Sequence, residues 1–159
     1  MHTENTVIIH GKKDRIFELA AAIENWPDIL PHYREVFVFD RSADGNRKVV
    51  EMAAVRDGFP VPGVRFPVRW RSVQVCDPDE SKIYFKHTKG IAMGMWVVWE
   101  LVQNSDGSVS VTIGHDLVYP LAFLNGWFAK KLVGHIFVES IAGRTLATLK
   151  SIVESEVRK

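Results

Sequence analysis

The chain has 159 residues and a formal net charge of +1 at pH 7, with 47% hydrophobic, 25% charged and 11% aromatic residues. This length and apolar share predict a single domain over residues 1–159 and exclude an intrinsically disordered chain. With 20 Lys+Arg against 19 Asp+Glu there is no basic surplus, so we expect no nucleic-acid partner. The one cysteine, Cys76, excludes an internal disulfide and a thiolate zinc site.

The sequence shows no targeting or membrane-spanning segment. The charged residues at positions 12–15 interrupt the apolar run that a signal peptide needs. The longest uncharged stretch, 117–129, is shorter than the ~18–20 residues of a membrane span. Together with the single cysteine, these features predict a cytoplasmic protein.

The first third of the chain predicts a strand followed by two short helices. Residues 6–10 form a β-branched run typical of a strand, and Gly11 ends it. Residues 12–24 carry apolar side chains at helical spacing, and the helix should end before Pro27 because the residue preceding a proline disfavours the helical region. A second short helix over 27–30 should follow.

From residue 33 to about residue 118 the pattern predicts six successive antiparallel strands joined by tight turns. The strand over 64–76 is the most regular, with Phe66, Trp70 and Gln74 on one face. The next strand places Phe85 and His87 on one face. Met93, Met95, Val97, Trp99 and Leu101 share a face in the strand after it, and His115 lies on an otherwise aliphatic face of the last strand.

After Pro120 the pattern becomes helical again, and an apolar stripe predicts a long helix over 130–157. The order strand, helices, strands and long helix predicts an α+β fold, in which a curved antiparallel sheet of about seven strands wraps around the C-terminal helix.

This order of elements, together with the run Ile23-Glu24-Asn25-Trp26-Pro27 and the later Tyr33, resembles the START/Bet v1-like (SRPBCC) superfamily. Within it, the chain is most similar to the branch of polyketide cyclases and aromatases and their coenzyme-Q-binding relatives. The resemblance implies a helix-grip fold enclosing an apolar cavity, hence a ligand-binding domain over 1–159 and, as the ligand, a hydrophobic small molecule.

The resemblance also implies the residues that line this cavity. Trp26 matches the family tryptophan after the first helix, and Tyr33 matches the tyrosine that opens the second strand. Trp70 and Trp99 match tryptophans of the central strands. Gln74 stands where the family has an arginine, and Gly11-Lys12 stands where the family usually has Ala-Pro.

The types and positions of several residues predict the chemistry of the site. His115 on an inward face is a candidate general base, with a neutral core histidine as the alternative. Tyr33 is a second candidate catalytic residue, as a hydrogen-bond donor to a ligand carbonyl, with a core tyrosine whose hydroxyl lies at the rim as the alternative. Gln74, sharing the face of Phe66 and Trp70, needs hydrogen-bond partners, which either a ligand or its neighbours supply. Phe85 and His87 are further candidate ligand contacts, although His87 also fits a solvent-facing strand end. The histidine spacings predict no metal site, and we expect no cofactor.

Two surface features suggest contacts with other molecules. The apolar stretch 117–129, which includes Trp127, is a candidate lid over the cavity or a membrane-touching tip, and the proline-containing loop 58–63 is a second candidate rim element. The outward row Arg65, Arg69 and Arg71 fits either a solvated face paired with acids or a docking surface for an acyl carrier protein.

Two functions therefore stay open. The first is aldol cyclisation and dehydration of a poly-β-ketone, as the resemblance to polyketide cyclases and aromatases implies. The second is non-catalytic carriage of a lipid or quinone, which needs only the cavity and a gate.

Overall fold

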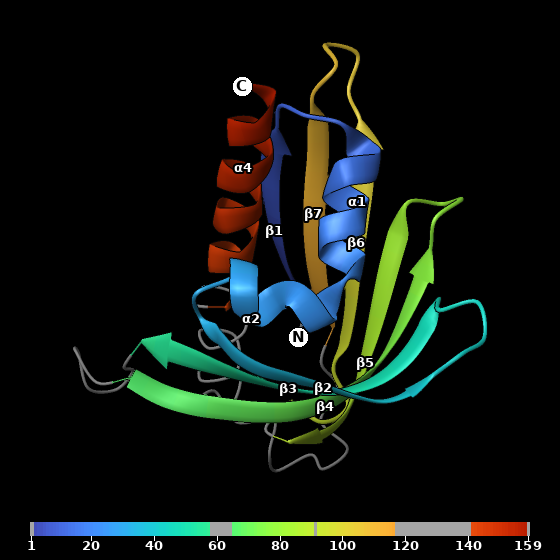
Figure 1. The fold of residues 1–159 in the computed structure, drawn as a ribbon, viewed down its shortest axis with the longest axis vertical. Helices are drawn as coiled ribbons and strands as arrows, with labels where there is room; N and C mark the ends of the chain where they lie inside the picture. The colour runs from blue at the N-terminus through green and yellow to red at the C-terminus, as the bar shows by residue number, and fades with distance from the viewer. Residues whose placement is uncertain (1, 58–64, 91, 117–140, 159) are drawn as a thin grey trace.

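Seven strands form one antiparallel sheet, with helices packed against it (Figure 1). The computed structural model describes residues 2–57, 65–90, 92–116 and 141–158. Its elements in chain order are β1 (His2–Ile9), α1 (Lys13–Ala21), the 3-10 helix η1 (Ile23–Asn25), α2 (Trp26–Ile29), β2 (Tyr33–Arg41), β3 (Arg47–Asp57), β4 (Arg65–Asp77), β5 (Lys82–Gly90), β6 (Trp96–Gln103), β7 (Val109–Asp116) and α4 (Gly143–Val157).

The strand order is β1-β7-β6-β5-β4-β3-β2, so that β2 to β7 form a meander and β1 is the edge strand beside β7. Helix α4 packs against β1, and α1 packs against both β6 and α4. Register shifts in β2 and between Arg71 and Ser72 of β4 mark irregular pairing of the bulge type, which bends strands. This is the predicted α+β helix-grip architecture, and the prediction is confirmed.

Period-two alternation decides which side chains face the interior. In β7, Val109, Val111, Ile113 and His115 are buried, while the residues between them are half-buried. In β6, Val97, Trp99 and Leu101 are buried, and Trp96, which has the opposite parity, is 49% exposed. The inner face of these strands therefore forms one wall of the core.

The structure corrects several predicted boundaries. The first strand begins at His2 because its pairing with β7 extends from His2 to Ile9. The helix predicted over 12–24 ends at Ala21, because Ala22 leaves the helical conformation (ψ 60°) and a 3-10 turn follows. Met93 was predicted to share the inner face of β6, but it lies before that strand and is 54% exposed. Of the long C-terminal helix, α4 is the described part, and 117–140 lie outside the described residues.

Candidate functional site

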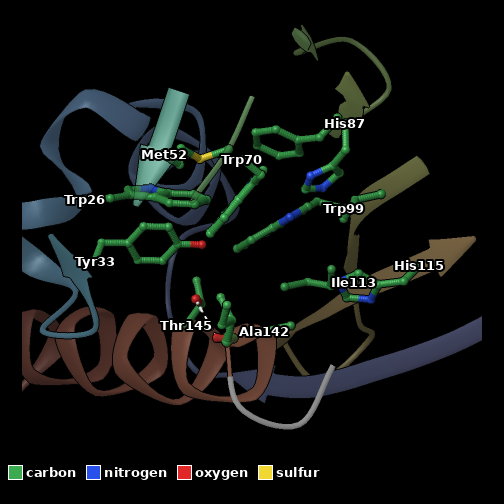
Figure 2. Close-up of a pocket in the computed structure, with 13 residues that line it drawn as sticks. Trp26, Tyr33, Met52, Trp70, His87, Trp99, Ile113, His115, Ala142 and Thr145 are labelled. Carbon is green, nitrogen blue, oxygen red and sulfur yellow. Dashed lines mark hydrogen bonds between the residues drawn. The ribbon is translucent and has the colours of Figure 1, made fainter. Parts of the chain in front are cut away.

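A cavity lies between the inner face of the sheet, α2 and the start of α4 (Figure 2). Its described lining comes from elements far apart in the sequence, so the fold assembles it. Aromatic and aliphatic side chains dominate this lining, and none of the described lining residues carries a permanent charge. The lining residues are Trp26, Tyr33, Met52, Trp70, Phe85, His87, Val97, Trp99, Ile113, His115, Ile141, Ala142 and Thr145.

The aromatic rings of this lining hold one another in place. The rings of Trp26 and Tyr33 meet edge to face, with centroids 4.9 Å apart at 64°, and Trp26 lies 5.9 Å from Trp99. Tyr33 lies 6.2 Å from Trp70 in a similar edge-to-face contact. The indole Nε1 of Trp26 donates to the carbonyl of Leu19 at 3.0 Å, which satisfies its polar atom outside the cavity. Fixed rings of this kind offer flat apolar faces to a planar ligand.

The free space in the cavity is limited. The space in which the centre of a water molecule fits is about 50 Å³. The empty volume of the whole recess, including the part that is open to solvent, is about 400 Å³. One water needs roughly 10–15 Å³ by the first measure. The enclosed space therefore holds a few waters or a small ring, and a larger ligand requires side chains at its edge to move.

Two buried histidines, His87 and His115, face this space (Figure 2). Both are 4% exposed. Burial lowers the pKa of His87 to about 3, helped by the nearby His115 and Lys86, and burial lowers the pKa of His115 to about 4. Both imidazoles are therefore neutral at pH 7. Ser72 contacts Nδ1 of His87 at 3.4 Å, whereas Nδ1 of His115 is buried and has no hydrogen-bond partner among the described residues.

Tyr33 places a phenol at the end of the cavity nearest α4. Burial raises the pKa of this phenol, and the nearby hydroxyl of Thr145 partly opposes the rise. The hydroxyl of Thr145 donates to the carbonyl of Ile141 at 2.9 Å and lies 2.9 Å from Nε2 of His32. Tyr33 is thus protonated at neutral pH and lies beside a second hydroxyl.

Gln74 does not line this cavity, which corrects the hypothesis that its amide meets the ligand. Its side chain is fully buried, and its Nε2 donates to the carbonyl of Ala21 at 3.2 Å. Nζ of Lys48 donates to the same carbonyl at 3.2 Å and pairs with Glu24 at 2.8 Å. Gln74 and Lys48 therefore satisfy a carbonyl at the C-terminal end of α1, where no intrahelical partner is left.

Most of the predicted site residues come together around the cavity. Trp26, Tyr33, Trp70, Phe85, His87, Trp99 and His115 all line it. His87 is buried there rather than solvent-facing. Phe66 lies in β4, but its side chain is outside what the structure describes, as are Trp127, the predicted lid 117–129 and the loop 58–63.

Sequence reasoning did not name six lining residues as site residues. The parity of Val97 and Ile113 with Trp99 and His115 was a usable signal. Met52 lies directly across from Trp70 in the β3–β4 pairing, which only the register reveals. Ile141, Ala142 and Thr145 lie at the start of the described C-terminal segment, and nothing local marks them as cavity residues.

The predicted outward arginine row is paired with acids. Arg69 bridges Glu35 at 2.6 Å and Glu51 at 3.1 Å, and Arg71 pairs with Glu51 at 3.0 Å. The guanidinium of Arg71 also lies 4.3 Å from the ring centroid of Phe39. These two arginines form a charge network on the outer face of the sheet; the side chain of Arg65 lies outside the described part.

Within the described ranges, no group of three or more His, Cys, Asp or Glu side chains is placed to hold a metal ion. No helix in the described part of the chain has the length and apolar character needed to cross a bilayer.

The sheet, the C-terminal helix and the enclosed cavity define the helix-grip class, and comparison with known families specifies it further. Residues 9–137 match the family model described as polyketide cyclase / dehydrase and lipid transport. Because this match covers most of the chain, the protein belongs to that family, and the START/Bet v1-like resemblance is confirmed.

Solved structures share the fold at low sequence identity. The Zhui aromatase/cyclase from a Streptomyces species superimposes with a TM-score of 0.80 at 18% identity, over 99% of this chain and 95% of its own. A START superfamily protein from Mycobacterium smegmatis gives 0.68 at 16% identity, with 97% of each chain covered. A major latex-like protein of Panax ginseng gives 0.67 at 13% identity, with 98% and 96% covered.

Proposed function

We propose that this protein binds an uncharged, planar, hydrophobic small molecule in the aromatic cavity. The observation that carries the proposal is the combination of aromatic walls with a buried polar atom, Nδ1 of His115, that has no hydrogen-bond partner among the described residues. A buried polar group without a partner costs about 1–3 kcal/mol, and a ligand hydrogen bond would recover part of this cost. Apolar pockets with a few convergent polar groups are typical of ligand sites.

The described lining favours uncharged ligands over acids. Tyr33 and both cavity histidines are neutral at pH 7, and the described lining contains no Lys or Arg. Transferring a carboxylate into such a site without a cationic partner is costly. We therefore expect naphthalene to bind and 2-naphthoate, its carboxylate derivative, to bind at least tenfold more weakly.

Isothermal titration calorimetry with naphthalene and 2-naphthoate tests the ligand class. The variant Ala142→Phe places a ring in the cavity and should weaken naphthalene binding at least tenfold.

Two tryptophans of β6 provide a matched test of location, because Trp99 lines the cavity and Trp96 is exposed. Quenching of tryptophan fluorescence by chromone, a planar ketone, should fall in Trp99→Phe and persist in Trp96→Phe. Equal quenching in both variants, or naphthalene binding that survives Ala142→Phe, contradicts the proposal.

A second function, aldol cyclisation of a poly-β-ketone, is favoured by the placement of His115 and Tyr33 in one cavity. Neutral His115 would take a proton from a methylene between two carbonyls, and the resulting enolate carbon would attack a distant carbonyl carbon. Tyr33 would donate a hydrogen bond to that carbonyl oxygen, and the protonated His115 would return its proton to this oxygen as the C–C bond forms. Loss of this hydroxyl with a neighbouring hydrogen, as water, would complete the dehydration. In this case an acyl carrier protein would supply the chain.

The low pKa of His115 makes it a weak base at pH 7, so positioning of the chain would supply most of the rate. The variant His115→Phe separates catalysis from carriage. A cyclase variant should still bind naphthalene but lose at least tenfold in cyclisation of a synthetic poly-β-ketone thioester. A carrier should produce no cyclised product in either form, and native mass spectrometry of the purified protein should then reveal a bound lipid or quinone.

A further inference from the structure

We propose that an open groove beside the aromatic cavity binds a phosphate monoester through Arg34 and Arg144. The groove lies between the turn after α2, the start of β2, the end of β3 and α4. The space in which the centre of a water molecule fits is about 390 Å³ there, which is within the size range of small-molecule sites. This second site is separate from the cavity, so the inference goes beyond the proposed function and does not depend on it.

A bulge in β2 places Arg34 in the groove. In the pairing of β2 with β3, Tyr33 lies opposite Ala54 and Glu35 lies opposite Ala53. Arg34 is therefore an extra residue with no partner on β3, and such a residue departs from the strict alternation of a strand and re-aims its side chain. Tyr33 lines the cavity, Glu35 belongs to the charge network of the outer face, and Arg34 lines the groove.

The guanidinium of Arg34 is not engaged by the described part of the protein. Its side chain is exposed and has no hydrogen-bond or ion-pair partner among the described residues. Arg69 and Arg71, by contrast, are both held by acids on the outer face of the sheet. The described lining of the groove contains no Asp or Glu. Arg34 can therefore bind an anion from outside the chain.

Arg144 supplies a second guanidinium from α4. It is half-buried and lines the same groove. Its neighbour Thr145 lies 2.9 Å from Nε2 of His32, a contact that holds α4 against the turn before β2. A guanidinium has five N–H donors in one plane, so Arg144 can bind an oxyanion in addition to the contacts that it makes within the protein.

The charge of the groove favours a dianion. His32 also lines it, but burial and the positive charge of Arg144 lower the pKa of His32 to about 4, so the imidazole is neutral at pH 7. The described lining therefore carries two positive charges and no negative charge. A phosphate monoester carries nearly two negative charges at neutral pH, and its oxygens match the planar fork of a guanidinium. A carboxylate would balance only one of the two arginines.

The remaining described lining favours an organic ester over inorganic phosphate. Pro31, Val55 and Ala147 are apolar, and Thr148 adds a hydroxyl. These apolar side chains can cover the organic group while the arginines hold the phosphate. We therefore expect phenyl phosphate to bind about fivefold more tightly than inorganic phosphate.

Isothermal titration calorimetry with phenyl phosphate at low ionic strength tests the site. Arg34→Gln and Arg144→Gln should each weaken binding about fivefold, because each removes one of the two charges that face the phosphate. Arg69→Gln is the matched control, since it removes the same charge from the outer face of the sheet, and it should change binding less than twofold. Thermal unfolding of each variant verifies that it is folded.

A new charge in the groove tests the location from the opposite direction. Ala147 is exposed on α4, and Ala147→Glu places a carboxylate beside the two arginines. This variant should weaken phenyl phosphate binding at least tenfold. The affinity for phenyl phosphate should be the same with and without naphthalene, because the two sites are separate.

Vesicle sedimentation identifies the source of the phosphate. Binding to vesicles that contain phosphatidic acid, but not to vesicles that contain the anionic diester phosphatidylglycerol, would support a lipid headgroup as the ligand, provided that Arg34→Gln abolishes it. Phenyl phosphate binding without vesicle binding would support a soluble phosphate monoester. The inference is overturned if the unmodified protein does not bind phenyl phosphate, if Arg34→Gln and Arg69→Gln weaken binding equally, or if naphthalene displaces phenyl phosphate. Absence of naphthalene binding contradicts only the proposed function of the cavity.

Discussion

Gln74 illustrates how one side chain can share the parity of a site and yet serve a different purpose. Its neighbour on the same face, Trp70, lines the cavity, but Gln74 lies further along β4 and reaches the end of α1. There it shares the carbonyl of Ala21 with Lys48. The same amide leaves its Oε1 buried without a partner among the described residues.

We expect Gln74→Met to leave ligand affinity unchanged within about twofold. The free energy of unfolding should change by no more than about 1 kcal/mol, because the lost hydrogen bond to Ala21 is offset by removal of the unsatisfied Oε1. Naphthalene titration and urea unfolding of the variant measure the two quantities. A tenfold loss of naphthalene affinity with unchanged stability would show that Gln74 contacts the ligand.

The buried histidines link stability to pH. His87 and His115 have pKa values lowered to about 3 and about 4, whereas an unfolded histidine titrates near its usual 6.5. Below pH 6.5 the unfolded chain therefore binds protons that the folded chain does not bind. The contribution of these histidines to the free energy of unfolding is complete above pH 6.5 and falls as the pH drops towards 4.

Urea unfolding between pH 7 and pH 4.5 should show this fall. In His115→Phe, one proton fewer is taken up on unfolding, so the slope near pH 5 should decrease by about 1.4 kcal/mol per pH unit. An unchanged slope would mean that His115 is protonated in the folded protein.

Among the elements, α4 approaches the turn after β1 closely at Gly11, which has no side chain. A Cβ built on Gly11 would lie 2.3 Å from Cγ1 of Val153, which is buried on α4. The structure thus gives a physical reason for glycine at position 11. A β-carbon at position 11 fits only if the side chain of Val153 shifts or is shortened.

Gly11→Ala should therefore lower the free energy of unfolding by about 1–3 kcal/mol through overpacking. Trimming the opposing side chain in Gly11→Ala/Val153→Ala should recover part of this loss, so that the double variant is more stable than the sum of the single changes predicts. Thermal or urea unfolding of the four proteins measures the coupling. Strict additivity would show that the two residues do not clash.

Considered as a molecule, the described part of the protein is a curved open sheet that, with its helices, surrounds an incompletely filled centre. Its cavity lining combines side chains from α2, most strands of the sheet and the segment at the start of α4. The strands that line the cavity also form the hydrophobic core. Ligand binding in the cavity and folding of the chain are therefore coupled.

A ligand that binds only the folded chain should therefore stabilise it. At a free concentration one hundred times its dissociation constant, naphthalene should raise the free energy of unfolding by about 2.7 kcal/mol. Urea unfolding with and without the ligand measures this, and Ala142→Phe, whose cavity is filled, serves as the control that should show no such gain. A gain in the control would locate binding elsewhere.

The amino-acid sequence alone was sufficient for the order of elements and for the inward faces of the strands, because period-two and helical patterns are local properties. On that basis Trp70, Trp99 and His115 could be assigned to one interior surface. The helix boundary after Ala21 was not predictable, because hydrogen bonds from Lys48 and Gln74, distant in the sequence, satisfy the carbonyl there.

Contacts between residues that are far apart in the sequence could be found only in the three-dimensional structure. His32 and Thr145 are 113 residues apart, and no local pattern joins an imidazole in the turn before β2 to a hydroxyl on α4. The free volume of the cavity is likewise a small difference between the space that the sheet encloses and the space that side chains fill. Such a difference depends on how all the elements pack together, and residue types and spacings do not contain it.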